Sequence, residues 1–242
     1  MRTAALFAAL LLASALLAAA ASADAPQRFA IHGRDVPPAD GPVVRVQAGG
    51  TLYIRQDSLP TLTGVEVGGA GRVLTWFGST LCYRPGTPRF SLGPGDQREA
   101  GAAPLVADGV VWLPAQMLSD AFGWRFDVQT DIVTLWTQGA AVQSIRQGVH
   151  DDRVRMVVDL SGPCPYQVRR DGAQLSICVP LAPGTPASAG QLRLLEFSSE
   201  VVPRVVEQVE ADGWLKLTFT HAGAGKANVF SLGGPARIVV DF

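Results

Sequence analysis

The stretch "VVWLPAQMLSDAFGWRFDVQTDIVTLW", residues 110–136, decides the fold. It holds Trp112, Trp124 and Trp136, three of the five tryptophans of the chain. These side chains form either an exposed aromatic platform for a sugar or peptide, or the interior of a small β domain. The choice determines whether the stretch offers a binding site at all.

The pattern of this stretch predicts a strand, a short helix and a β-hairpin, in that order. The helix is expected over 114–122. Pro114 stands where a first helical residue should be, and Gly123 stands where a C-terminal cap should be.

The same pattern occurs earlier in the chain. Residues 50–77 align without a gap on 109–136, and the glycine of the turn recurs as Gly64 and Gly123. This match predicts a duplicated β-helix-β-hairpin unit. In the first copy Pro60 predicts a turn or a short 3₁₀ piece instead of a helix. The alignment puts Trp112 on Tyr53 and Trp136 on Phe77, which favours packing positions over a platform.

The rest of the chain has short Val/Leu/Ile runs between Gly and Pro residues, which predicts a mainly β protein. Residues 82–104 are expected to be mostly loop. In the C-terminal half, 144–160 resembles 205–221, and 168–179 is echoed by 229–242. Two similar β units predict a β-sandwich.

The first residues indicate export. Residues 1–23 combine Arg2, an Ala/Leu run and the small-x-small site A-S-A, which predicts a signal peptide cleaved between Ala23 and Asp24. The alternative is a membrane anchor. After cleavage no later segment is apolar enough to span a membrane. The full chain has a formal charge of −1, so charge gives no reason to expect nucleic acid as a partner.

The cysteines leave two alternatives open. Cys164 and Cys178 flank a hairpin signal at Asp171-Gly172, and a turn there brings residues near 164 and 178 opposite each other. Export permits a disulfide between them. The other interpretation is two unpaired thiols.

Residues 109–136 resemble the copper amine oxidase-like N-terminal domain, also called a stalk domain, in their strand, "P-x-x-x-L" helix, Gly and hairpin ending in "V-T-L". The likeness extends over roughly 27–138. The segment from about 142 to 242 looks like an AMIN domain, through "RVRMVVDLSGPCPYQVRRDGAQLSICVP" and "GGPARIVVDF". The predicted architecture is therefore a stalk-like domain over 24–138 followed by an AMIN-like sandwich over 139–242.

These resemblances imply a role in the bacterial envelope. AMIN domains are associated with peptidoglycan binding and envelope localisation, and the pair of modules often precedes a catalytic domain such as an N-acetylmuramoyl-L-alanine amidase. AMIN domains also occur at the front of pilus secretins. The copper in the stalk family's name has no support here, because copper sites need clustered imidazoles and His32, His150 and His221 are far apart in sequence. We expect no metal and no cofactor.

No motif predicts catalysis. Asp57, Asp151 and Asp152 are the candidate carboxylates, but Asp151 and Asp152 are more typical of a turn before a strand, and no G-x-S-x-G sequence occurs. The candidate ligand-binding residues are arginines, because a guanidinium pairs bidentately with carboxylates such as those of peptidoglycan. They are Arg146, Arg153, Arg155, Arg169 and Arg170. The competing interpretation is a solvated charged face.

The sequence therefore predicts an exported, non-catalytic protein of the periplasm or cell envelope that binds peptidoglycan or another cell-wall component. Two alternatives remain. The chain is the N-terminal targeting part of a cell-wall hydrolase, or it is an interaction module for envelope proteins in a secretin or pilus assembly.

Overall fold

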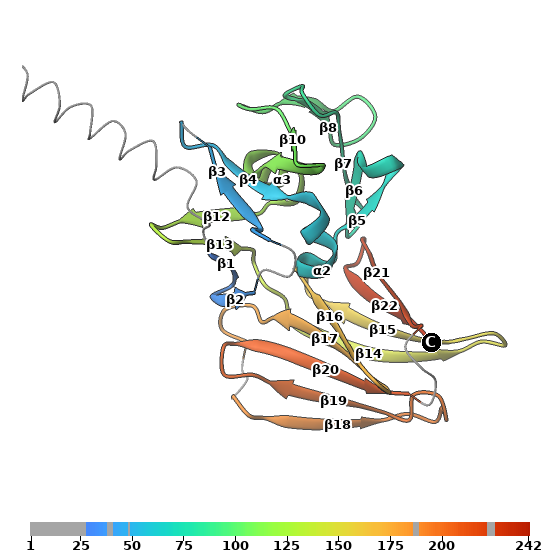
Figure 1. Ribbon diagram of the computed structural model, residues 1–242. Coiled ribbons are helices and arrows are strands. Elements are labelled where there is room, and N and C mark those ends of the chain that lie inside the picture. Colours follow the sequence, from blue (N-terminus) through green and yellow to red (C-terminus); the bar gives the residue numbers. More distant parts are fainter. Residues whose placement is uncertain (1–27, 38–40, 48, 186–188, 222–225) are drawn as a thin grey trace, which may run out of the picture.

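The computed structural model describes residues 28–37, 41–47, 49–185, 189–221 and 226–242. The predicted signal segment and its cleavage site at Ala23 and Asp24 lie outside these residues. The protein is mainly β, as predicted, and the strands of the described residues form five sheets. Three sheets belong to the first half (residues 28–136) and two to the second half (residues 142–241), which Figure 1 shows as two adjoining bodies.

The stretch 110–136 folds in the predicted order. Strand β11 (Val110–Pro114) leads into helix α3 (Ala115–Phe122), and the hairpin of β12 (Arg125–Val128) and β13 (Ile132–Trp136) follows. Gly123 caps the helix with a φ of 69°, the left-handed conformation in which glycine has no steric penalty.

The first copy has the same order of elements: β4 (Leu52–Arg55), α2 (Leu59–Thr63), then β5 (Glu66–Gly68) paired with β6 (Val73–Trp76). The expectation of only a turn or a 3₁₀ piece was wrong. A 3₁₀ turn, η1 (Gln56–Ser58), is followed by a five-residue α-helix. Pro60 lies in the first turn, where its missing N–H needs no partner.

The two copies join through their first strands. β4 pairs antiparallel with β11, and the sheet order is β10-β11-β4-β3, with β3 at Val44–Val46 and β10 at Leu105–Ala107. A second sheet, β12-β13-β1-β2, adds β1 (Arg28–Ile31) in parallel to β13 and β2 (Arg34–Val36) at its edge.

Residues 82–104 are mostly loop, as expected, but they also contribute short strands that the sequence did not predict. The third sheet has the order β5-β6-β7-β8-β9, and its last three strands are β7 (Ser79–Tyr83), β8 (Arg89–Ser91) and β9 (Gln97–Glu99). β9 is three exposed polar residues, so no hydrophobic alternation marks it as a strand. A short helical turn, η2 (Gly69–Gly71), joins β5 to β6.

The tryptophans pack inside the first half, as the repeat predicts. Trp112 and Trp124 are buried, and the Trp124 ring lies 5.3 Å from the ring of Trp76 in an edge-to-face arrangement. Trp136 is half-buried and lies edge-on to His32 at 5.4 Å. The three side chains are therefore not a free aromatic platform.

The second half contains two antiparallel sheets. One has the order β14-β15-β22-β21 and the other β16-β17-β20-β19-β18. Their bounds are β14 Val142–Val149, β15 Val154–Leu160, β16 Gln167–Asp171, β17 Gln174–Pro180, β18 Leu192–Glu196, β19 Arg204–Val209, β20 Trp214–Thr220, β21 Asn228–Leu232 and β22 Arg237–Asp241.

The faint repeat of this half corresponds to hairpins. The first pair of repeated segments, 144–160 and 205–221, corresponds to the hairpins β14–β15 and β19–β20. The second pair, 168–179 and 229–242, corresponds to the hairpins β16–β17 and β21–β22. Each sheet combines one hairpin from each copy, through β15–β22 and β17–β20. Burial alternates along β15, with its inner residues in a hydrophobic cluster that also includes the inner residues of β17 and β20. Within the described residues, no helix is long and apolar enough to cross a membrane.

Candidate functional site

Two of the predicted arginines lie on the outer face of the sheet β14-β15-β22-β21, the four-stranded sheet of the second half. Each of them is paired with an aspartate. Arg146 on β14 donates to Asp159 through Nε at 2.7 Å and Nη2 at 2.8 Å. Arg155 on β15 donates to Asp241 on β22 through the same two atoms, at 2.6 Å each. The bidentate edge of each guanidinium is therefore already occupied, and a carboxylate ligand would have to compete with the aspartate.

These pairs set the ionisation of the face. The hydrogen bond from Arg146 lowers the pKa of Asp159 to about 2, against a weaker opposing effect of burial. The hydrogen bond from Arg155 likewise lowers the pKa of Asp241. Both carboxylates are consequently charged at neutral pH, so the face alternates cations and anions and has no net excess of positive charge from these pairs.

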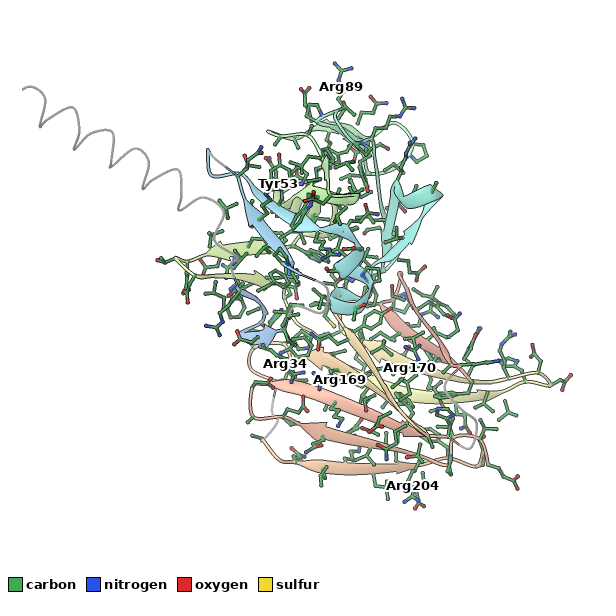
Figure 2. The ribbon with its side chains drawn as sticks, in the orientation of Figure 1. Arg34, Tyr53, Arg89, Arg169, Arg170 and Arg204 are labelled. Atoms are coloured by element: carbon green, nitrogen blue, oxygen red, sulfur yellow. The ribbon has the colours of Figure 1, made fainter. Side chains whose placement is uncertain are left out.

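The structure does not bring all five arginines together. Arg153, just before β15, lies 3.0 Å from Asp152 and 3.9 Å from Asp241, on the side of Arg155. Arg169 and Arg170 lie on β16, in the other sheet, and are exposed. Figure 2 shows Arg169 on the side of Arg34 and Arg170 on the side of β21. The predicted site is thus two separate surfaces.

Arg170 lines a groove where the two halves meet. The groove has a volume of about 1050 Å³, and its walls come from α2 and β5 of the first half and from β16 and β21 of the second. Its lining includes Glu66, Val67, Tyr166, Val168, Arg170 and Val229. Arg170 reaches across it, and its Nη2 donates to the carbonyl of Ala227 at 3.0 Å. No local sequence pattern indicates this groove, because its walls are formed by segments that lie far apart in the chain.

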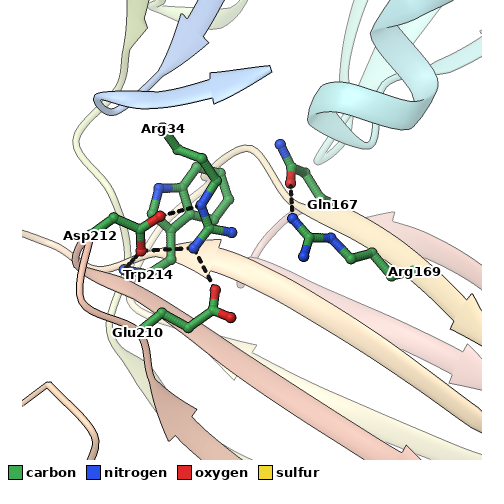
Figure 3. Close-up of polar contacts among 6 residues, drawn as sticks. All are labelled: Arg34, Gln167, Arg169, Glu210, Asp212 and Trp214. Carbon is green, nitrogen blue, oxygen red and sulfur yellow. Dashed lines mark hydrogen bonds and ion pairs between the residues drawn. The ribbon is translucent and has the colours of Figure 1, made fainter. Parts of the chain in front are cut away.

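A second contact between the halves is built around Arg34 of β2 (Figure 3). Its Nε and Nη2 donate to the carboxylate of Asp212 at 2.5 and 2.8 Å, and Nη2 also donates to Glu210 at 2.5 Å. The guanidinium carbon lies 4.3 Å from the centroid of the Trp214 ring. Sequence reasoning missed Arg34 because it did not predict the β1–β2 hairpin that presents it.

Of the two alternatives for Cys164 and Cys178, the structure has the unpaired thiols. Cys164 and Cys178 are both free and buried, and the strand register places Gln167, not Cys164, opposite Cys178. The hairpin at Asp171-Gly172 does form, but Cys164 lies before β16 begins. Burial raises the pKa of both thiols, which lowers their reactivity.

The histidines stay apart in the structure. His32 accepts a hydrogen bond from the backbone N–H of Thr137 at 3.0 Å, and burial lowers its pKa to about 4. His221 is buried against the ring of Phe242 at 4.9 Å. In the described part of the chain, no three His, Cys, Asp or Glu side chains gather in a way that could hold a metal ion. Asp57 is engaged by Arg55 at 2.6 Å.

The comparisons with known proteins bear on the second half. Residues 128–179 match the AMIN domain. The match runs from β12 through β17, and it contains all five predicted arginines. AMIN domains are generally associated with peptidoglycan binding or targeting in periplasmic proteins. No finding supports the likeness of the first half to the copper amine oxidase-like N-terminal domain.

The fold also resembles a solved structure, the crystal structure of a hypothetical protein from Synechocystis. The TM-score is 0.54 at 19% sequence identity, and the match covers 90% of this chain but only 35% of that one. This chain therefore spans about a third of the length of the protein it resembles, and the likeness concerns the fold alone. No curated protein sequence matches the chain.

Proposed function

We propose that this protein is an exported, non-catalytic module that binds or localises at peptidoglycan in the periplasm or cell envelope. The observation that carries the proposal is the AMIN match over residues 128–179. The stalk-like domain over 24–138 would act as a scaffold, and the AMIN-like sandwich over 139–242 would carry the binding surface. That surface would be the outer face of the four-stranded sheet.

The outer face has chemistry suited to the hydroxyl groups and rings of a saccharide. Arg146 keeps 60% of its side chain exposed although it is paired, so its remaining N–H donors face solvent. Arg155 also lies 5.9 Å from the ring centroid of Phe230, which places an aromatic side chain beside the charges. Paired charges and an aromatic edge can hydrogen-bond hydroxyls and pack against a sugar ring without releasing the internal aspartates.

Cosedimentation with purified sacculi tests the proposal. The protein without residues 1–23 should sediment with the sacculi, and a double variant Arg146→Ala, Arg153→Ala should sediment at least fivefold less. The matched control is Arg89→Ala, Arg204→Ala, because both arginines are exposed and lie in other sheets, Arg89 on β8 of the first half and Arg204 on β19 (Figure 2). Wild-type protein that stays in the supernatant would refute wall binding. An equal loss of sedimentation in both double variants would refute the proposal that this face binds the wall.

The alternative of a targeting segment in a cell-wall hydrolase makes a different prediction. The genomic reading frame beyond codon 242 would then encode a domain with clustered zinc ligands. A stop codon at that position in the natural gene would contradict this alternative without affecting wall binding.

A further inference from the structure

The groove between the halves is bordered by edge strands of both sheets of the second half. β16 is the edge of the five-stranded sheet, and β21 is the edge of the four-stranded sheet. The backbone N–H and C=O groups on the free side of an edge strand have no neighbouring strand to pair with. In this protein both free sides face the same hollow.

The strand register identifies the backbone groups that point into the groove. Asp171 and Gln174 close a two-residue hairpin, so this pair exchanges hydrogen bonds, and alternation assigns the next bonded pair to Arg169. The backbone groups of Tyr166, Val168 and Arg170 therefore point away from β17. The N–H of Tyr166 confirms this direction, because it donates to the carbonyl of Thr63 in the first half at 3.3 Å.

The first half fills only one end of the groove. The carbonyl of Thr63 accepts the hydrogen bond of the Tyr166 N–H. The carboxylate of Glu66 accepts one from the N–H of Ser231 on β21 at 3.4 Å. Further along β16, the outward N–H groups of Val168 and Arg170 have no hydrogen-bond partner among the described residues. The backbone N–H and C=O groups of Val168 and Arg170 thus remain available for a partner. The two residues are spaced by about 7 Å, which is the two-residue repeat of an extended chain.

The walls favour particular side chains. Val67 is 40% exposed and Leu232 is 37% exposed, and together with Val168 and Val229 they make the lining near the first half apolar. Arg170, at the other end, is exposed and uses one N–H on Ala227. A guanidinium has five donors, so others remain for a carboxylate.

We propose that the free edge of β16 binds an extended peptide segment of a protein partner by strand addition. The backbone of the segment pairs with Val168 and Arg170, its apolar side chains enter the groove near Val67 and Val229, and an acidic side chain meets Arg170. Strand addition takes its affinity from main-chain hydrogen bonds and its specificity from pockets for alternate side chains. This surface is separate from the outer face proposed for wall binding.

Fluorescence anisotropy with a synthetic peptide tests the proposal on the chain without residues 1–23. The probe is the labelled heptapeptide Glu-Val-Thr-Val-Thr-Val-Thr. Its first comparison peptide carries N-methyl groups on alternate backbone nitrogens, and its second replaces Glu with Lys. We expect saturable binding of the probe. Both comparison peptides should bind about tenfold more weakly, because each loses hydrogen bonds that strand addition or the arginine needs.

Two proline variants locate the binding edge. Val168→Pro removes an outward N–H of β16 without breaking the β16–β17 ladder, and it should abolish binding. Leu194→Pro is the matched control. The bonds from Val209 to Gln191 and from Phe197 to Pro203 show that Leu194 also points its N–H outward, from β18 at the opposite edge of the same sheet. Its binding should equal that of the wild type.

Arg170→Ala should remove the preference for Glu over Lys and leave binding of the Lys peptide unchanged. Four results would overturn the proposal: no saturable binding, equal binding of the N-methylated peptide, equal loss in the two proline variants, or an unchanged Glu preference in Arg170→Ala. Sacculus sedimentation of Val168→Pro should match the wild type, which separates this surface from wall binding.

Discussion

Asp159 shows how a single ion pair ties stability to pH. Its pKa is lowered to about 2 in the folded protein because Arg146 and Ser144 donate hydrogen bonds to its carboxylate. In the unfolded chain the same group titrates near 3.8. The stabilisation is therefore complete above about pH 4 and is lost as pH falls towards 2.

The melting temperature should accordingly decrease between pH 4 and pH 2, and Asp159→Asn should make this decrease smaller by removing one of the carboxylates whose pKa is lowered. Asp131→Asn is the control, because Asp131 is exposed and lies 3.9 Å from Arg28. Equal curves for Asp159→Asn and the wild type would show that the pair contributes no pH-dependent stability.

The cysteines give a second prediction at the scale of the residue. Native protein should react with a thiol reagent at Cys82, which is half-buried, before the buried Cys164 and Cys178. In denaturant without reductant, three thiols should be titrated, since all three cysteines are free. A count of one would mean that Cys164 and Cys178 are bonded, and the strand register around β16 would then be wrong.

At the scale of the element, the glycines that cap the two helices have the same backbone conformation in different surroundings, so substitutions at them can be compared directly. Gly64 and Gly123 end equivalent helices with φ values of 72° and 69°. A Cβ at Gly123 would meet nothing within 4 Å, whereas one at Gly64 would lie 2.1 Å from the Tyr166 ring of the second half. An alanine would therefore have the same backbone strain at both caps, but only at position 64 would it also clash with a neighbouring side chain.

Gly123→Ala should lower the free energy of unfolding by about 1 kcal/mol, the cost of a left-handed alanine. Gly64→Ala should cost about 2–4 kcal/mol, because the Tyr166 ring must also move. Urea denaturation measures both. Equal costs would show that Tyr166 does not pack on this cap in solution.

The elements also show what the sequence can and cannot predict. The order of β11, α3, β12 and β13 follows from local signals: an apolar period, Pro114 and Gly123. β9 escapes such reasoning because its three residues are polar and exposed. The prediction of one arginine site was wrong for a related reason. The alternation of apolar residues along the strand places Arg155 on an outer face. The pairing of Arg155 with Asp241, and the location of Arg146 and Arg170 in different sheets, depend on the order of the strands, which local patterns do not contain.

At the scale of the whole molecule, the halves are joined by contacts with opposite chemistry. Near the groove the contact is tight and mostly uncharged. A Cβ on Gly233 would lie 2.1 Å from the carbonyl oxygen of Phe77, and the N–H of Phe77 donates to Ser231 at 3.2 Å. On the other side, the contact is the ion-pair cluster of Arg34. Two separated contacts fix the angle between the halves, and with it the shape of the groove.

The Arg34 cluster should therefore contribute to the stability of the whole molecule. Its side chain is only 10% exposed, and it satisfies Asp212 and Glu210 while covering Trp214. Arg34→Ala leaves two partly buried carboxylates without their cation and should lower the free energy of unfolding by about 1–3 kcal/mol. Arg34→Lys keeps the charge but loses the bidentate bond and the stacking, so its cost should be intermediate.

Arg28→Ala is the matched control, one strand away on β1. Arg28 pairs with Asp35, and both side chains are more than half exposed, at 59% and 57%. Such a surface pair contributes less than about 1 kcal/mol. If urea denaturation gave equal losses for Arg34→Ala and Arg28→Ala, the cluster would not hold the halves together. A larger loss for Arg34→Ala, with weaker peptide binding in the groove, would show that the distant cluster sets the groove's shape.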